Sequence, residues 1–475
     1  MNESAAAWAY TALTRAVRES VLTVLAMAAA IACSQAVARG PASGVLGAVL
    51  ALSLARSHLA AERRGWLEAL VLLPVVSVAS LGIAALLHHA PWLGAAAFIA
   101  TATVPSWTRR LGAKTQHLGR LVALPLVTVL VVPRLPQQPA WALPPGLAVF
   151  APAVVALLAL ACVLLAQGLG RVTGWLPPRA SAAPSPAPAA APGTLRPSAP
   201  VRLALQMVVT LAVAFAVGFL AFPAHWRWLV LSALLVNLGS IGRFDVLRRG
   251  VLRVLGAAGG TVLAMGVAGH AAGDVATVGA LALACVFVGL VLRVFGYGWW
   301  VLCVTLALAL LQTLEPAAEP LLLWRRLLEI AVGALIAVAA SALVFPIPST
   351  DILRRRIANA LAAMSAALDP QATERPTQDI IGAINLVRQM TPVFRAHGLA
   401  HRLARRPDAA WPALWIDSLL ACEAPVLVLV ERGQTPGAVR QAIGAARRTM
   451  REPDEIGAAL AALRAALEAA AKSSR

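Results

Sequence analysis

The chain has 475 residues, of which 60% are hydrophobic and only 13% are charged, and its mean hydropathy is +0.77. Soluble proteins carry about 25% charged residues, so this composition excludes a soluble protein over most of the length and predicts one embedded in a lipid bilayer. The formal net charge is +19. Most basic residues before position 347 flank apolar runs, where membrane topology explains them, so we do not expect nucleic acid as a partner.

Twelve apolar runs predict membrane-spanning helices, each of which needs about 20 apolar residues to cross a bilayer. Three of the runs are short, and for these we expect either strong tilt or a re-entrant path. The predicted spans are 19–38, 41–56, 67–87, 92–107, 118–133 and 147–169 in the first half of the chain, and 204–222, 226–240, 251–270, 275–292, 298–314 and 327–346 in the second.

The two halves repeat one layout, because charged and glycine landmarks of residues 16–140 recur 184 or 185 positions later. Arg18 corresponds to Arg202, Arg63-Arg64-Gly65 to Arg248-Arg249-Gly250, and Arg109-x-x-Gly112 to Arg293-x-x-Gly296. Six spans per copy is an even number, so both copies would enter the bilayer from the same side. The repeat is therefore predicted to be parallel, an arrangement found in membrane transporters.

The basic residues up to position 346 also orient the predicted spans. Eighteen Lys or Arg fall on the side of the N-terminus, whereas five fall on the other side: Arg39, Arg134, Arg227, Arg325 and Arg326. Cytoplasmic loops carry the excess of Lys and Arg. We therefore expect a multi-pass protein of the inner (plasma) membrane with both termini in the cytoplasm.

Two further segments differ from the spans in composition. Residues 177–200 hold eight prolines and eight alanines, which predicts an extended, solvated cytoplasmic linker. Residues 349–475 hold 17 Lys or Arg and 12 Asp or Glu, and their helical periodicity predicts a cytoplasmic domain of about five helices. One long periodic run begins at Thr377 and continues to about Arg406.

The expected fold class is thus an all-α polytopic membrane protein, with two parallel repeats of about six transmembrane helices and a C-terminal helical cytoplasmic domain. Its predicted divisions are a first transmembrane repeat at 1–176, the Pro/Ala-rich linker at 177–200, a second transmembrane repeat at 201–348 and the helical domain at 349–475.

The sequence contains no motif of a known enzyme class: no Walker loop, no G-x-S-x-G and no Cys-x-x-Cys. His397 and His401 have the spacing of two metal ligands on a helix but lack the glutamate of H-E-x-x-H, so a solvated helix face is the better interpretation. We therefore expect no catalytic residue, no metal and no cofactor.

Glu329 is the main candidate for a functional side chain, because an ionisable group about one turn into the last span is costly. Arg325 and Arg326 precede it by four and three positions. One interpretation is a helix-end ion pair with these arginines, and the other is a proton relay. The corresponding position in the first copy is Pro145, so either role would belong to the second copy alone.

Specific roles are also expected for other polar and small residues in the spans. Glycines one helical turn apart, Gly256 and Gly260, predict close helix packing, and Gly333 is assigned the same role. Asn237 and Gln35 are amides near span ends, suited to interhelical hydrogen bonds or to substrate contacts. Arginines at the inner end of a span would attract organic anions to a cytoplasmic mouth, although topology explains them equally: Arg248, Arg249 and Arg253.

Residues 200–348 contain two motifs, Arg253-x-x-Gly256-x-x-x-Gly260-Thr261 and Arg326-x-x-Glu329-x-x-x-Gly333, and Pro346, which closes the last span. With these features the segment resembles the fusaric acid resistance family of membrane proteins. Residues 16–170 match this family only in layout. The resemblance implies an inner-membrane transporter for efflux of small amphiphilic or aromatic organic acids, with a periplasmic adaptor protein as a candidate partner.

Two alternatives to efflux remain open. Plant malate-permeable channels are similar in their membrane domain, so the resemblance also admits a passive organic-anion channel. A non-transport envelope scaffold protein, whose helical tail recruits cytoplasmic partners, is the third hypothesis. In the two transport hypotheses the partners are the bilayer and a small organic anion substrate, and a homo-oligomer is a further candidate assembly.

Overall fold

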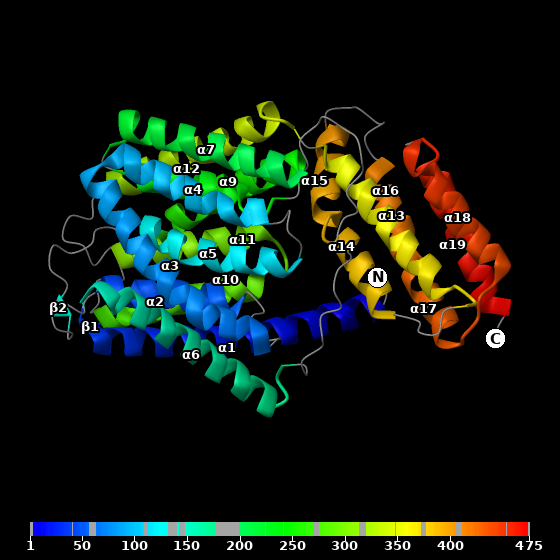
Figure 1. The fold of residues 1–475 in the computed structure, drawn as a ribbon, viewed down its shortest axis with the longest axis horizontal. Helices are drawn as coiled ribbons and strands as arrows, with labels where there is room; N and C mark the ends of the chain where they lie inside the picture. Colours follow the sequence, from blue (N-terminus) through cyan, green and yellow to red (C-terminus); the bar gives the residue numbers. More distant parts are fainter. Residues whose placement is uncertain are drawn as a thin grey trace. The chain divides into compact units, whose positions relative to one another are not determined.

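In the computed structural model, the regular elements of the described residues are helices apart from one two-residue antiparallel pairing, β1 (Ala38–Arg39) with β2 (Ala140–Trp141) (Figure 1). Residues 177–198, nearly all of the predicted linker, lie outside the described residues, as do Pro145 and Arg134. The described residues are 3–39, 41–56, 63–108, 113–131, 140–141, 148–176, 199–223, 225–240, 242–268, 275–312, 320–346, 348–371, 377–403, 411–452 and 454–473.

Each of the twelve predicted spans coincides with a helix. The first half contains α1 (Glu3–Val37), α2 (Pro41–Ala55), α3 (Arg63–His89), α4 (Pro91–Thr108), α5 (Ala113–Val131) and α6 (Ala151–Val172), the last preceded by the short 3-10 helix η3 (Ala148–Phe150). The second half contains α7 (Ala199–Ala221), α8 (Trp226–Asn237), α9 (Arg243–Ala268), α10 (Val275–Leu292), α11 (Tyr297–Gln312) and α12 (Pro320–Leu343).

Helix α9 begins at Arg243 rather than at the predicted residue 251, because polar turns can extend a helix beyond the apolar run that reveals it.

Several of these helices can cross a bilayer by length and composition. Six stretches of the described residues are long and apolar enough: Leu13–Val37, Gly65–His89, Ala151–Val172, Val201–Ala221, Trp324–Leu343 and Pro412–Glu431. Shorter apolar helices include Ser43–Ala55, Trp226–Asn237, Ala276–Leu292 and Tyr297–Leu311. The protein is accordingly a multi-pass membrane protein.

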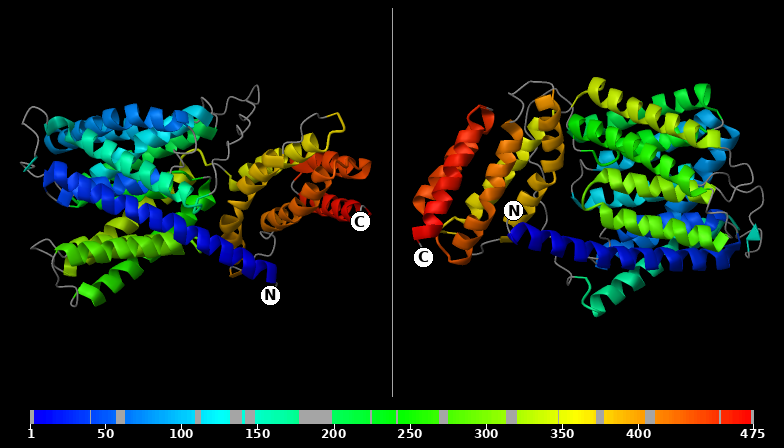
Figure 2. Two further views of the ribbon diagram at one scale, coloured as in Figure 1. Left: turned by 90° about the horizontal axis from the view of Figure 1, so that it is seen from below. Right: turned by 180° about the vertical axis from the view of Figure 1, so that it is seen from behind.

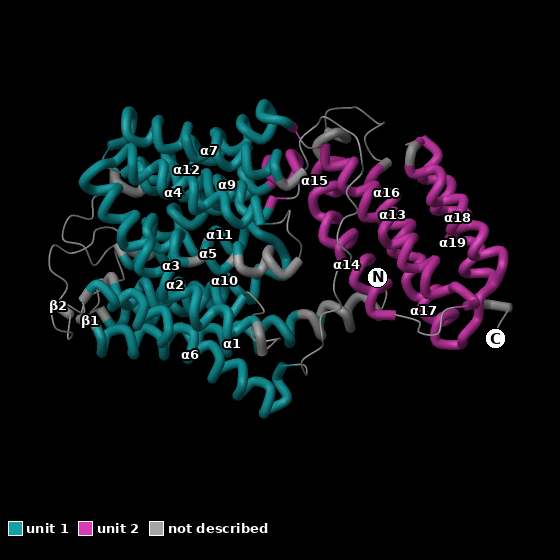
Figure 3. Tube along the Cα trace, in the orientation of Figure 1, with its two compact units in different colours: residues 1–182, 189–239, 249–345 teal, residues 183–188, 240–248, 346–475 magenta. Residues whose placement is uncertain are grey.

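The chain forms two compact units (Figure 3). Unit 1 contains the described residues up to 239 and from 249 to 345, whereas unit 2 contains those between 240 and 248 and those from 346 onward. Within unit 1 the helices lie side by side (Figures 1 and 2). One buried core joins α1, α2, α3 and α6, and another joins α3, α4 and α5 to α7 and α8.

The two halves of unit 1 pack in corresponding ways. Helices α1, α2 and α6 contact one another, and so do α7, α8 and α12. Between the halves, α4 packs against α7, and α1 packs against α10 (Figure 2). Each of these two contacts joins the first helix of one half to the fourth helix of the other.

Unit 2 contains seven α-helices in its described residues, rather than the expected five: α13 (Ser349–Ala367), α14 (Thr377–Arg388), α15 (Thr391–Leu403), α16 (Trp411–Ala421), α17 (Glu423–Glu431), α18 (Gly437–Arg448) and α19 (Ile456–Ser473). The helix α18 is followed by the 3-10 turn η5 (Thr449–Arg451). The expected count is wrong because the periodic run from Thr377 divides at Gln389–Met390, and the apolar stretch 412–431 divides at Cys422.

The stretch 412–431 belongs to the core of unit 2, although it is long and apolar enough to be a candidate span. Trp415, Leu419 and Val426 are buried there among residues of α13, α14, α18 and α19. Two of its three carboxylates are paired: Asp417 with Arg395 at 3.3 Å, and Glu423 with Arg388. Apolar side chains packed inside a helical domain and charges held by neighbours explain this stretch without a bilayer.

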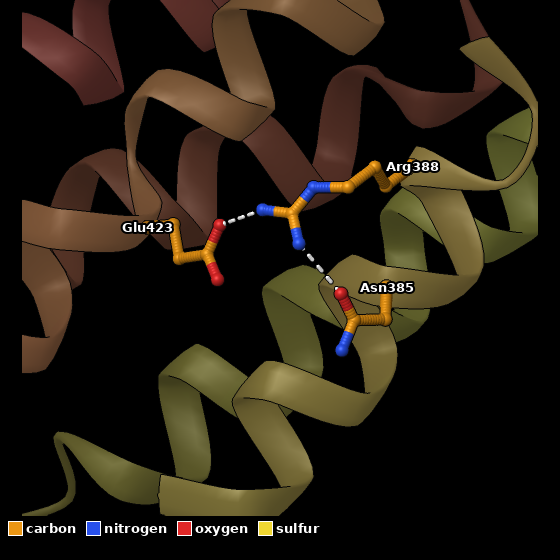
Figure 4. Close-up of polar contacts among 3 residues, drawn as sticks. All are labelled: Asn385, Arg388 and Glu423. Atoms are coloured by element: carbon orange, nitrogen blue, oxygen red, sulfur yellow. Dashed lines mark hydrogen bonds and ion pairs between the residues drawn. The ribbon is translucent and has the colours of Figure 1, made fainter. Parts of the chain in front are cut away.

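The pairing of Glu423 links two helices of unit 2 (Figure 4). Arg388, at the end of α14, donates one hydrogen bond to Glu423 at the start of α17 and another of 2.6 Å to Asn385 one turn earlier. Both ends of this contact suit the helix dipoles, because the cation lies in a last turn and the anion in a first turn.

Residues 244 and 245 pack within the same unit. The ring of Phe244 stacks on His397 with 3.9 Å between centroids, and its backbone N–H donates to the Ser349 hydroxyl. His397 is therefore half-buried against an aromatic ring rather than part of a solvated face. Burial lowers the pKa of Arg356, and the nearby carboxylate of Asp245 partly offsets this effect.

Candidate functional site

The candidate site lies where α8 packs against α12, and a glycine permits their close approach. A Cβ atom at Gly333 of α12 would collide with the carbonyl oxygen of Leu229 and would lie 3.0 Å from the Cβ atom of Ser232, both in α8. Small residues at helix crossings let backbones come together in this way. The packing role predicted for Gly333 agrees with this geometry.

One turn before Gly333, the same helix contributes buried charges. The exposed fraction of Glu329 is 2%, that of Arg326 is 5%, and that of Arg253 from α9 is 9%. Arg326 lies within electrostatic reach of both Arg253 and Glu329. We call Ser232, Arg253, Arg326 and Glu329 the buried charged cluster, and its described side chains carry one more positive than negative charge.

Each arginine of the buried charged cluster reaches α8. Arg253 donates from Nε to the Ser232 hydroxyl at 3.0 Å. The guanidinium carbon of Arg326 lies 3.8 Å from the centroid of the Trp228 ring, which is a close cation–π contact. The interface between α8 and α12 thus combines two buried cations with an aromatic face.

Glu329 makes its ion-pair contact with a residue outside its own helix. Its Oε1 lies 3.8 Å from Nδ1 of His225, the residue directly before α8. Its second oxygen, Oε2, is buried and has no hydrogen-bond partner in the described part of the structure. Arg325 is exposed, so the two arginines that precede Glu329 in sequence occupy different environments.

Amide side chains of unit 1 connect helices near the C-terminal end of α8. Asn237 donates to the Thr210 hydroxyl of α7 at 2.6 Å, which agrees with the predicted interhelical role. Gln206, a residue the sequence interpretation did not single out, donates to the carbonyls of Val344 at 2.8 Å and Phe345 at 3.2 Å. It thereby satisfies carbonyl groups at the end of α12. Gln35 of α1 lies beside Gly44 of α2.

The other glycines expected to pack helices do so between α9 and α11. A Cβ atom at Gly256 would lie 2.8 Å from the Gly298 carbonyl oxygen, and one at Gly260 would lie 2.9 Å from the Cβ atom of Thr305. Distances this short leave no room for a side chain. Both glycines therefore set the distance between these two helices.

The three arginines proposed to attract anions at a cytoplasmic mouth have separate surroundings. Arg249 donates to the carbonyls of Leu238 at 2.9 Å and Gly239 at 3.3 Å, just past the end of α8. Arg253 contributes to the buried charged cluster, and Arg248 is half-buried. Attraction of anions by this group stays a prediction.

The sequence interpretation missed His225, which contacts Glu329, and Ser232, which accepts a hydrogen bond from Arg253. Ser232 interrupts an apolar run and is therefore a local signal, whereas His225 directly precedes Trp226 and interrupts no such run. Their proximity to position 329 has no local signal, because about a hundred residues separate the partners.

The comparisons with known proteins concern this same region. Residues 206–340 match the model of the fusaric acid resistance protein-like family. The match confirms the resemblance expected for residues 200–348 and contains every member of the buried charged cluster. Neither a curated protein nor a solved structure matches the chain.

Proposed function

We propose that the protein is an inner-membrane transporter that exports small amphiphilic or aromatic organic acids. The observation that carries the proposal is the buried charged cluster, in which two arginines accompany one carboxylate. Buried charge inside a membrane domain is costly and usually functional. Arginine suits a carboxylate ligand because it can form two parallel hydrogen bonds with a carboxylate.

Trp228 is the reason for proposing that the ligand has an aromatic part. Its ring lies beside Arg326, so a ligand carboxylate near the guanidinium would have an aromatic surface within reach. The match of residues 206–340 to a resistance-related family supports export rather than an unrelated role. Both termini would lie in the cytoplasm, as the distribution of Lys and Arg suggests.

Transport is tested with purified protein in liposomes and radiolabelled benzoate as the probe. We expect exchange of internal for external benzoate and its accumulation driven by a pH gradient. Arg326→Gln should reduce exchange by at least about tenfold, because the benzoate carboxylate loses a buried positive partner. Arg325→Gln is the matched control, since it changes the adjacent but exposed arginine, and it should retain exchange within about twofold.

The same assay separates the alternatives. A passive channel would pass benzoate down its gradient without stimulation by benzoate on the far side. An envelope scaffold protein would give no benzoate flux above that of empty liposomes. Equal exchange by the Arg326→Gln and Arg325→Gln proteins would reject the buried charged cluster as the binding site.

The proposed topology has its own test. Cysteines introduced at Arg134 and Ala190 are treated with a membrane-impermeant maleimide in intact cells. We expect labelling at position 134 alone, and labelling of both positions from one side would reject the topology.

A further inference from the structure

His225 connects the buried carboxylate to the aqueous phase. It directly precedes α8, and its side chain is 37% exposed, whereas that of Glu329 is 2% exposed. Their facing atoms, Nδ1 and Oε1, are 3.8 Å apart. A single imidazole thus lies between solvent and a carboxylate that is shielded from it.

The charged groups that the described residues place around this pair are cations. Helix α12 contributes Arg325 and Arg326, α9 contributes Arg253, and α8 contributes Arg227, whose guanidinium lies over the Trp226 ring at 5.7 Å. Helices α5 and α7, which also pack against α8, have their basic residues in the first halves of their sequences: Lys114, His117, Arg120 and Arg202. Their second halves supply the apolar residues of the core around α8, such as Leu130 and Phe215.

We propose that His225 and Glu329 form the proton-exchange pair of the transport site, with His225 as the group that carries protons between water and Glu329. This inference rests on the proposed function. When a proton enters, the imidazole takes it from a hydronium ion of the aqueous phase, which leaves a water molecule and an imidazolium. It then gives the Nδ1 proton to Oε1 of Glu329, which leaves a neutral imidazole and a neutral carboxylic acid.

Both partners suit this exchange chemically and geometrically. Imidazole is the side chain whose charge changes at about pH 5–8, so it can accept and release protons near neutrality. Direct transfer needs a separation of about 2.6–3.2 Å or one bridging water, so the facing atoms must approach by about 1 Å or share a water. The unpartnered Oε2 of Glu329 leaves that carboxylate without a hydrogen bond that would oppose its protonation.

The pair is tested first without any substrate, by labelling Glu329 with a hydrophobic carbodiimide, which modifies protonated carboxyl groups. Labelling is measured by mass spectrometry on full-length protein in nanodiscs. An imidazolium beside Glu329 favours the ionised carboxylate, so His225→Gln should raise labelling at about pH 5.5 by about threefold or more. His88→Gln, which changes an exposed histidine at the end of α3, is the matched control and should label as the wild type does.

The second measurement separates proton coupling from anion binding, with the benzoate liposomes described above. His225→Gln should keep benzoate exchange at equal pH within about twofold, but should reduce accumulation driven by a pH gradient by about tenfold or more. A merely structural role would lower both activities together. If His225→Gln yields no folded protein, His225→Asn is measured in its place, with size-exclusion profiles as the criterion of folding.

The outcomes are distinct. Accumulation by the His225 variant at the wild-type level overturns the proton-exchange role, and so does an unchanged pH profile of Glu329 labelling. Wild-type protein that neither exchanges nor accumulates benzoate contradicts the proposed function instead. In that case the labelling profile still decides whether His225 controls the protonation of Glu329.

Discussion

The two halves of unit 1 have similar helices but use polar side chains differently. In the first half, buried hydroxyls bond within their own helices: Thr23 donates to the Glu19 carbonyl at 2.7 Å, and Ser80 to that of Val76 at 2.7 Å. In the second half, polar side chains connect different elements, as Asn237 does with Thr210 and Arg253 with Ser232. The first half also has one longer bond between helices, from Gln167 of α6 to the Ala55 carbonyl of α2 at 3.4 Å, but the buried charged cluster belongs to the second half.

Positions that correspond under the predicted repeat also carry different residues in the two halves. Under the predicted shift of 185 residues, Arg253 corresponds to Glu68 and Ser232 to Gly47, and Glu329 corresponds to Pro145 under the shift of 184. The apolar layout recurs, but the buried charged cluster does not. If the halves derive from one unit, the chemistry therefore belongs to the second copy, and the first provides packing surfaces.

The largest expected effect concerns Glu329. Glu329→Gln should reduce gradient-driven benzoate accumulation by at least about 100-fold in a folded protein, because glutamine cannot carry the proton. Glu68→Gln, on the half-buried acidic residue of the first half, should leave accumulation unchanged. If the role of Glu329 is instead an ion pair, Glu329→Gln lowers the yield of folded protein, and exchanging Glu329 with Arg325 partly restores it.

A second comparison uses one substitution at two glycines. Gly333→Ala places a methyl group against the Leu229 carbonyl and should lower stability by about 2 kcal/mol. Gly168→Ala in α6 of the first half meets nothing within 4 Å, so the better helix propensity of alanine should raise stability by up to about 1 kcal/mol. Thermal unfolding of the detergent-solubilised proteins measures both, and shifts of the same sign would contradict the packing argument.

The helices of unit 1 could be predicted because a bilayer imposes a strong compositional requirement on each span. The helix breaks in unit 2 were missed although the sequence signals them. The chain divides just after Met390 and at Cys422, and Pro392 and Pro425 follow these positions by two and three residues. A proline inside a helical pattern marks a break, but the apolar periodicity continues across both positions and hides it.

The candidate site was only half predictable for a related reason. Glu329 is visible in sequence because a charge interrupts an apolar run. Its contact with His225 is not, since helix spacing indicates only Arg325 and Arg326, which are four and three positions away and which also act electrostatically on Glu329. In the structure Arg325 is exposed and Arg326 lies over Trp228, so the ion-pair contact of Glu329 is made by His225 from another element.

A third prediction concerns the hydrogen bond between α7 and α8. Asn237→Ala removes the donor to Thr210 and should lower stability by about 1 kcal/mol, because a buried interhelical hydrogen bond is lost. The Thr210→Val variant and the double variant complete a thermodynamic cycle. A coupling energy indistinguishable from zero would mean that this contact adds nothing to the connection between these helices.

The smallest effect is expected in the first half, at Ser80. Its hydroxyl donates to the Val76 carbonyl, which lies four residues earlier and is also the usual acceptor for the backbone N–H of residue 80. Ser80→Ala therefore leaves no carbonyl without a partner, and alanine is the better helix former, so stability should change by less than about 0.5 kcal/mol. Thermal unfolding under the conditions used for Asn237→Ala gives the direct comparison. A loss at Ser80 as large as that at Asn237 would show that hydroxyls of the first half also bind across helices, and the proposed division between the halves would fail.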